Sequence, residues 1–126
     1  IEQYVEKHPD KNFKLSSNGI WYSALNVLSK PPKKGTQIDY KYSVYTLDNT
    51  LLYGYDQTSP QTYFFDEQPI LLGLREGLSL LPKASSGIFL LPSVLAYGVV
   101  GDHKKINPNT PLLVHMTVTN INYTNN

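Results

Sequence analysis

One segment of this chain has the apolar spacing of a long amphipathic helix, and this constrains the fold more than any other feature. Apolar residues recur there at helical intervals, which predicts a helix from about Pro69 to Leu81. They are Ile70, Leu71, Leu74, Leu78 and Leu81. Pro69 suits a first helical turn, and Pro82 ends the helix because its ring cannot continue it. A helix with one apolar side must bury that side against another layer.

Strand patterns occupy much of the remaining chain and supply that layer. Within residues 37–47, apolar and polar side chains alternate with the period of a half-buried strand. Shorter or less regular strand patterns occur at 13–28, 51–53, 63–65, 87–91 and 112–122. The sequence therefore predicts an α+β fold, in which a mostly antiparallel sheet packs on one helix.

The chain has the length of one domain, with 126 residues. Lys30–Gly35 is a clear break that reads either as a linker or as a loop, and we favour a loop because the preceding flank is too short to fold alone. We expect residues 1–34 to be an N-terminal extension that adds strands to a domain spanning 35–126. The long loop at 92–111 is too apolar to be a passive connection, which indicates a functional role.

Composition excludes several classes of function. The net charge is +1, which gives no reason to expect a nucleic-acid partner. There is no cysteine, so disulfides and thiol catalysis are excluded, and His8, His103 and His115 lack metal-ligand spacing. No apolar run is long enough to span a membrane. Because the chain opens at Ile1 without methionine, we expect that a leader was removed or left out.

Four segments, in order, resemble the FKBP-type peptidyl-prolyl cis/trans isomerases. Residues 91–98 read LPSVLAYG, close to the family's "IPSELAYG", and residues 70–77 read ILLGLREG, close to "VIxGWEEG". Residues 35–48 are similar to the family's "GxxVxVHYTGxLxDG" strand. The family's "G…IPPNATLVF" run is matched by Gly101, Ile106, Pro108, Asn109 and Leu112 to Val114.

The resemblance implies an FKBP-like fold, a bent antiparallel sheet wrapped around the helix, and a prolyl isomerase that needs no cofactor and no metal. It places Tyr97, Tyr42 and Leu71 at catalytic positions, with the Tyr97 hydroxyl and the Leu71 backbone N–H donating to substrate carbonyls. It places further pocket walls at Leu52, Tyr53, Ile70, Leu74, Ile106 and Val114. Periodicity alone explains Tyr42, Ile70, Leu71 and Leu74 equally well as core residues.

One departure from the family bears on activity. The family has Phe-Asp-Ser where this chain has Leu52-Tyr53-Gly54, so an aromatic wall and a carboxylate are both changed. Asp56 lies nearby but is displaced. We expect the carboxylate contact to be lost and catalysis to be weak. A non-catalytic proline-peptide-binding or chaperone module is therefore the alternative function, and an unrelated small β-rich binding domain is a third.

Within the family, the chain is similar to the gliding-motility-associated lipoproteins of Bacteroidetes. The similarity lies in Gly19 to Tyr22, in Tyr42 to Tyr45 and in the Ala96–Asp102 segment. It implies a periplasmic or cell-envelope location and a proline-containing protein client. Membrane attachment would come only through an acylated N-terminal cysteine, which this chain lacks. We expect a monomer.

Overall fold

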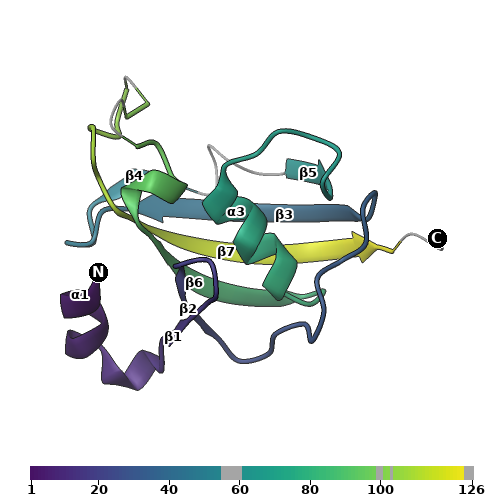
Figure 1. Ribbon diagram of the computed structural model, residues 1–126, viewed down its shortest axis with the longest axis horizontal. Helices are drawn as coiled ribbons and strands as arrows, with labels where there is room; N and C mark the ends of the chain where they lie inside the picture. The colour runs from purple at the N-terminus through teal and green to yellow at the C-terminus, as the bar shows by residue number, and fades with distance from the viewer. Residues whose placement is uncertain (55–60, 99–100, 103, 124–126) are drawn as a thin grey trace.

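An antiparallel sheet runs through the molecule, and one helix crosses one of its faces (Figure 1). The computed structural model describes residues 1–54, 61–98, 101–102 and 104–123. In this part of the chain the sheet has seven strands in the order β1-β2-β6-β7-β3-β4, with β5 also paired to β3. The strands are β1 (Lys14–Leu15), β2 (Trp21–Ala24), β3 (Gln37–Tyr45), β4 (Leu51–Tyr53), β5 (Gln61–Phe64), β6 (Ser85–Leu91) and β7 (Leu112–Asn122). The predicted α+β class is confirmed.

The central pair of the sheet is β3 and β7. The alternation predicted for 37–47 corresponds to β3, which buries Ile38, Tyr40 and Val44. Its register against β7 shifts between Asp39 and Tyr40, where β7 carries an extra residue. Such a bulge bends a strand and increases its twist. The long central strands thus curve around the helix instead of lying flat.

The main helix, α3, spans Leu72–Leu80. The predicted start at Pro69 is wrong, because Leu71, the residue just before the helix, has an extended backbone with φ −56° and ψ 134°. Ile70 and Leu71 therefore approach the helix instead of belonging to it. At the other end Leu81 is extended and Pro82 follows, as predicted.

Helix α3 packs closely on the sheet. At Gly73, an added Cβ would lie 2.1 Å from Leu91 Cδ2 and 2.9 Å from the Leu95 carbonyl oxygen. At Gly77, it would lie 3.3 Å from the sulfur of Met116. These two glycines let the helix backbone approach β6 and β7, where a side chain would hold it away. Leu78, on the same helix, is fully buried.

The two faces of the sheet are distinguished by alternate residues. We call the α3 side the helix face; it carries Val44, Phe89 and Val114, which are paired across three strands. The opposite side is the outer face; it carries Ser43, Ile88 and His115 in the same way.

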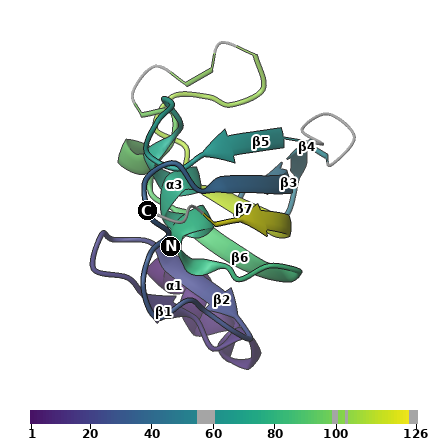
Figure 2. The same ribbon diagram turned by 90° about the vertical axis from the view of Figure 1, so that its right-hand side faces the viewer.

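The N-terminal residues form one edge of the sheet and reach the outer face. Helix α1 spans Glu2–Lys7 and is followed by a short 3-10 helix at Pro9–Lys11. Strand β2 pairs with β6 and β1 with β2, at the edge far from β4 and β5 (Figure 2). Ile20, just before β2, is fully buried in the core. The division of the chain at residue 34 stays a prediction.

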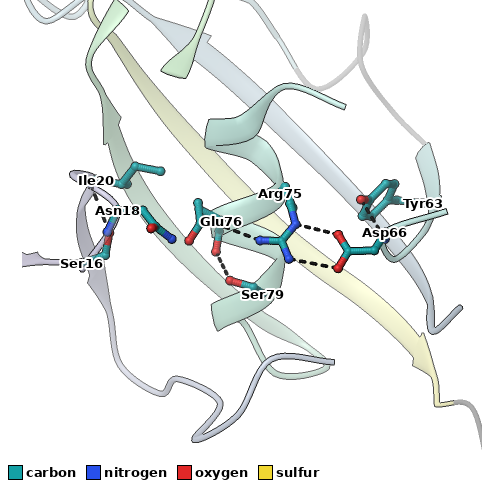
Figure 3. A network of polar contacts seen from close by, with 8 residues as sticks. All are labelled: Ser16, Asn18, Ile20, Tyr63, Asp66, Arg75, Glu76 and Ser79. Carbon is teal, nitrogen blue, oxygen red and sulfur yellow. Dashed lines mark hydrogen bonds and ion pairs between the residues drawn. The ribbon is translucent and has the colours of Figure 1, made fainter. Parts of the chain in front are cut away.

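A polar network ties α3 to the turn after β5 (Figure 3). The Arg75 guanidinium donates to both carboxylate oxygens of Asp66, at 2.7 and 3.0 Å, and lies 4.8 Å from the centroid of the Phe65 ring. The Tyr63 hydroxyl accepts from the Asp66 backbone N–H at 3.0 Å. The network fixes the middle of the helix against the sheet.

No helix within the described ranges is long and apolar enough to cross a membrane.

Candidate functional site

Three tyrosines from separate segments gather beside the start of α3. Tyr42 lies on β3, Tyr53 ends β4, and Tyr97 follows the 3-10 helix Ser93–Leu95. All three are half-buried and pack against the hydrophobic core. We call Tyr42, Tyr53 and Tyr97 the tyrosine cluster. It brings together one substrate-binding and two catalytic residues predicted from the sequence.

The geometry of β4 puts Tyr53 on the helix face. Tyr53 is the register partner of Val44, whereas Leu51 is the partner of Tyr45. Leu52 is therefore the extra residue of a β-bulge. Residues directly opposite in an antiparallel pair share a face, so Tyr53 joins Val44 and Tyr42 on the side of α3. Without the bulge, β4 would present Leu52 there instead.

The tyrosine hydroxyl groups keep their protons at neutral pH. Burial, followed by the nearby Tyr42, Asp102 and Tyr53, raises the pKa of Tyr97 above 10.0. Burial likewise raises the pKa of Tyr42. A buried neutral phenol is a hydrogen-bond donor as well as an acceptor. The cluster therefore offers hydroxyl donors in a setting from which water is partly removed.

The approach to α3 forms a second side of the site. Ile70 and Leu71 are half-buried and pack on the core. The Leu71 carbonyl accepts from the Arg75 N–H at 3.0 Å, which begins the helical ladder. The Leu71 N–H has no acceptor among the described residues. Unpaired N–H groups at helix starts are available to a ligand carbonyl.

Three of the predicted wall residues lie deeper than the others. Leu74, Ile106 and Val114 are 6%, 3% and 1% exposed, so they form core behind the cluster. For Leu74 this matches the core interpretation that periodicity left open. Tyr42, Ile70 and Leu71, which the same interpretation covered, keep part of their surface exposed.

A carboxylate that sequence reasoning did not select also reaches the site. Asp102 accepts a hydrogen bond from the Tyr53 hydroxyl, and it accepts from the backbone N–H groups of Lys104 at 2.9 Å and Ile106 at 2.8 Å. The displaced Asp56 lies outside the described residues, so its place is not tested. The sequence did carry a signal for a turn at Asp102, because an aspartate side chain commonly accepts hydrogen bonds from backbone N–H groups a few positions later.

Hydrogen bonds to Asp102 favour its ionised form. Partial burial raises the pKa of Asp102, but hydrogen bonds from Tyr53, Ile106 and Lys104 outweigh this and hold the pKa at about 2. The same bond to Asp102 raises the pKa of Tyr53. The Lys105 ammonium lies 5.0 Å from the centroid of the Tyr53 ring, within cation–π range. At neutral pH the pair is thus an anion bound to a neutral phenol.

The described residues include no group of His, Cys, Asp and Glu side chains arranged to hold a metal ion. What the cluster offers is an apolar, aromatic surface with a few fixed donors. A surface of that kind is suited to binding a peptide carbonyl group without any nucleophile.

Comparison with known proteins identifies relatives of this fold. The profile of the FKBP-type peptidyl-prolyl cis-trans isomerases matches residues 29–118. No curated protein sequence matches the chain.

Solved structures share the architecture. FkpA from Escherichia coli superposes with a TM-score of 0.77 and 23% identity over 97% of this chain. A peptidyl-prolyl cis-trans isomerase from Pseudomonas syringae pv. tomato gives 0.73 and 23% over 95% of this chain and 89% of its own. The N-terminal domain of FKBP42 from Arabidopsis thaliana gives 0.74 and 16% over 87% of this chain and 91% of its own. The chain spans 57% of FkpA. At these identities the likeness shows the fold.

Proposed function

The chain belongs to the FKBP-type peptidyl-prolyl cis-trans isomerase family, and from this premise we propose that it accelerates rotation about the bond preceding proline in protein clients. The observation that carries the proposal is the convergence of Tyr42, Tyr53 and Tyr97 beside the start of α3.

The chemistry explains why such a surface is sufficient. An X–Pro bond has cis and trans forms within about 1 kcal/mol of each other, yet they interconvert over tens to hundreds of seconds. The barrier of about 20 kcal/mol comes from amide resonance. A catalyst therefore has to bind the twisted amide better than either planar form. An apolar site does so because the twisted amide is less charge-separated and loses less on leaving water.

Each part of the site has a role in this scheme. The tyrosine rings and Ile70 would enclose the proline ring and keep water away. The Tyr97 hydroxyl and the Leu71 N–H would donate to the two carbonyl groups that flank the twisting bond. Donors fixed before the reaction cost no reorganisation when the bond twists. Leu74, Ile106 and Val114 support these groups from the core.

The sequence resemblance supports a proposal for the client and the location. We propose proline-containing proteins of the periplasm or cell envelope as clients, and a monomeric enzyme. A lipid anchor would have to lie outside the 126 residues, since they contain no cysteine.

A second candidate is a proline-peptide-binding module without efficient turnover. The observation that favours it is the sequence Leu52-Tyr53-Gly54, which changes both the aromatic wall and the carboxylate of the family's Phe-Asp-Ser. Peptide binding would then persist while the rate of isomerisation stays that of the free peptide.

Exchange NMR on a short Leu-Pro-Phe peptide separates the two functions. We expect the native chain to raise the cis-trans exchange rate, and Tyr97→Ala to lower kcat/KM by about tenfold or more through loss of a donor and a wall. Tyr45→Ala, a tyrosine change on the same sheet but on the outer face, is the control and should leave the rate unchanged. Peptide binding without acceleration would select the binding module.

A further inference from the structure

A side-chain hydrogen bond joins Tyr53 of the tyrosine cluster to the loop before β7. Tyr53 closes β4, and Asp102 lies 49 positions later in the loop before β7. Their hydrogen bond links the end of β4 to the loop before β7. It lies beside the proposed site and plays no part in the isomerisation scheme above.

Asp102 also closes its own loop. One carboxylate oxygen accepts from the N–H groups of Lys104 and Ile106, and the Asp102 N–H donates to the Ile106 carbonyl at 3.0 Å. Gly101 precedes it with φ +68°, and an added Cβ there would lie 2.3 Å from the Ile106 oxygen. Only glycine fits so close to the returning backbone. The position of the carboxylate is thereby fixed by the backbone, with its second oxygen left for Tyr53.

A carboxylate held in this way fixes the phenol in turn. Hydrogen bonds to an ionised acceptor are roughly twice as strong as those between neutral groups. Lys105, 5.0 Å from the Tyr53 ring centroid, adds an attraction to the same ring. Tyr53 would otherwise lie on a short edge strand with freedom to rotate, since β4 has only three residues.

We propose that Asp102 is a positioning residue for the peptide site: it holds the Tyr53 ring in place as a wall beside Tyr97 and so sets the affinity for proline peptides. This rests on the proposed function and deepens it. A wall that is already fixed loses less side-chain freedom on binding, which strengthens binding without any new contact. Asp102 itself does not touch the substrate.

A double-mutant cycle tests the proposal. The four proteins are native, Tyr53→Phe, Asp102→Asn and the double variant, each measured for peptide Kd by NMR titration and for kcat/KM by exchange NMR. Asparagine keeps an oxygen for the N–H groups of Lys104 and Ile106, so the loop stays closed while the charge is lost. We expect each single change to weaken binding about fivefold, and the double change to weaken it no further. Single effects that multiply would overturn the proposal.

A matched control is available on the same chain. Asp48 is another turn aspartate that accepts from two threonine hydroxyls and a backbone N–H, but it lies in the turn between β3 and β4. Asp48→Asn should leave Kd and kcat/KM unchanged. An equal loss of affinity in Asp48→Asn and Asp102→Asn would mean that both changes act only through the stability of the fold. That result would overturn the proposal.

A spectroscopic signature separates positioning from mere stability. With 13Cζ-labelled tyrosine, the pKa of Tyr53 should fall toward 10.0 in Asp102→Asn, because the bond that raises it is removed. An unchanged titration would overturn the link.

A native chain that binds peptide without accelerating exchange, yet shows coupling in Kd, would reject isomerase function and keep the role of Asp102. An active native chain with no coupling would do the reverse, and a chain that binds no proline peptide would reject both.

Discussion

The two faces of the sheet offer different surfaces to a ligand. On the outer face, a hollow of about 740 Å³ lies between the N-terminal segment and β6, lined by Lys11, Ser86 and His115 among others. On the helix face, half-buried tyrosines and the start of α3 present apolar surface with a few donors. The outer hollow is lined by charged and hydroxyl side chains, which favour contact with water over contact with an apolar proline ring. Volume alone therefore does not decide which face carries the proposed site.

A matched pair of leucine changes should show how unequally the two faces stabilise the fold. Leu78 on α3 is fully buried, whereas Leu25 beside the outer hollow is 100% exposed. We expect Leu78→Ala to lower the free energy of unfolding by about 3 kcal/mol, through lost burial and a cavity. Leu25→Ala should change it by less than about 0.5 kcal/mol. Urea unfolding measures both, and a comparable loss at Leu25 would mean that another surface covers it.

A tyrosine pair tests which face carries the activity. Tyr97→Phe removes only a hydroxyl from the helix face, and we expect kcat/KM to fall about tenfold, or about 1.4 kcal/mol, because a donor to the twisted amide is lost. Tyr45→Phe removes the same group from the outer face and should have no effect. Exchange NMR gives both values. Equal rates for Tyr97→Phe and the native chain would remove the hydroxyl from the mechanism.

A change at Arg75 tests whether a residue on the helix face can affect stability without affecting activity. Arg75→Met should lower the free energy of unfolding by about 1 kcal/mol, because it breaks a partly exposed ion pair with Asp66 and the contact with the Phe65 ring. The kcat/KM of the folded protein should stay that of the native chain. A fall in kcat/KM without a change in stability would instead place Arg75 in the site.

The two faces should also respond differently to pH. Burial, followed by nearby Lys11, lowers the pKa of His115 below 6.5. The unfolded chain then binds a proton at a higher pH than the folded chain does. Stability should therefore be complete above pH 6.5, decline as the pH falls from 6.5 to the folded-state pKa, and level off below it. His115→Asn should remove this decline in urea unfolding followed between pH 7 and 5. Persistence of the full decline in His115→Asn would assign it to another group.

On the helix face no such titration is expected. The pKa of Asp102 is about 2, and that of Tyr97 lies above 10.0. The kcat/KM of native protein should therefore be constant between about pH 5 and 9. A bell-shaped profile centred in this range would point to an ionising group in the reaction.

Periodicity and motif order predicted much of this fold. Alternation and turn residues predicted the strand at 112–122 and the short strand at 51–53. Such patterns arise because one side of a half-buried strand faces the core and the other faces water. The start of α3 was misplaced because Pro69 is compatible with a first helical turn, and only the extended backbone of Leu71 decides against it. Local preference could not distinguish the two.

The site was predicted less completely than the fold. The segment matches placed Tyr42, Tyr97 and Leu71, yet Asp102 was not chosen. The role proposed for Asp102 depends on a bulge at Leu52 that places Tyr53 on the helix face, and on this hydrogen-bond partner being 49 positions away. A one-residue shift in strand register reverses which side chain faces the site. The local sequence pattern does not determine the register between segments that are far apart in the chain.

The most direct test of the account is amide NMR of the 15N-labelled native chain titrated with a Leu-Pro-Phe peptide. We expect the amide signals of Leu71, Tyr97 and Asp102 to shift on titration. A matched Leu-Ala-Phe peptide should shift them far less. Shifts that instead gather at Lys11, Ser86 and His115 would place the peptide in the outer hollow and contradict the assignment of the site to the helix face.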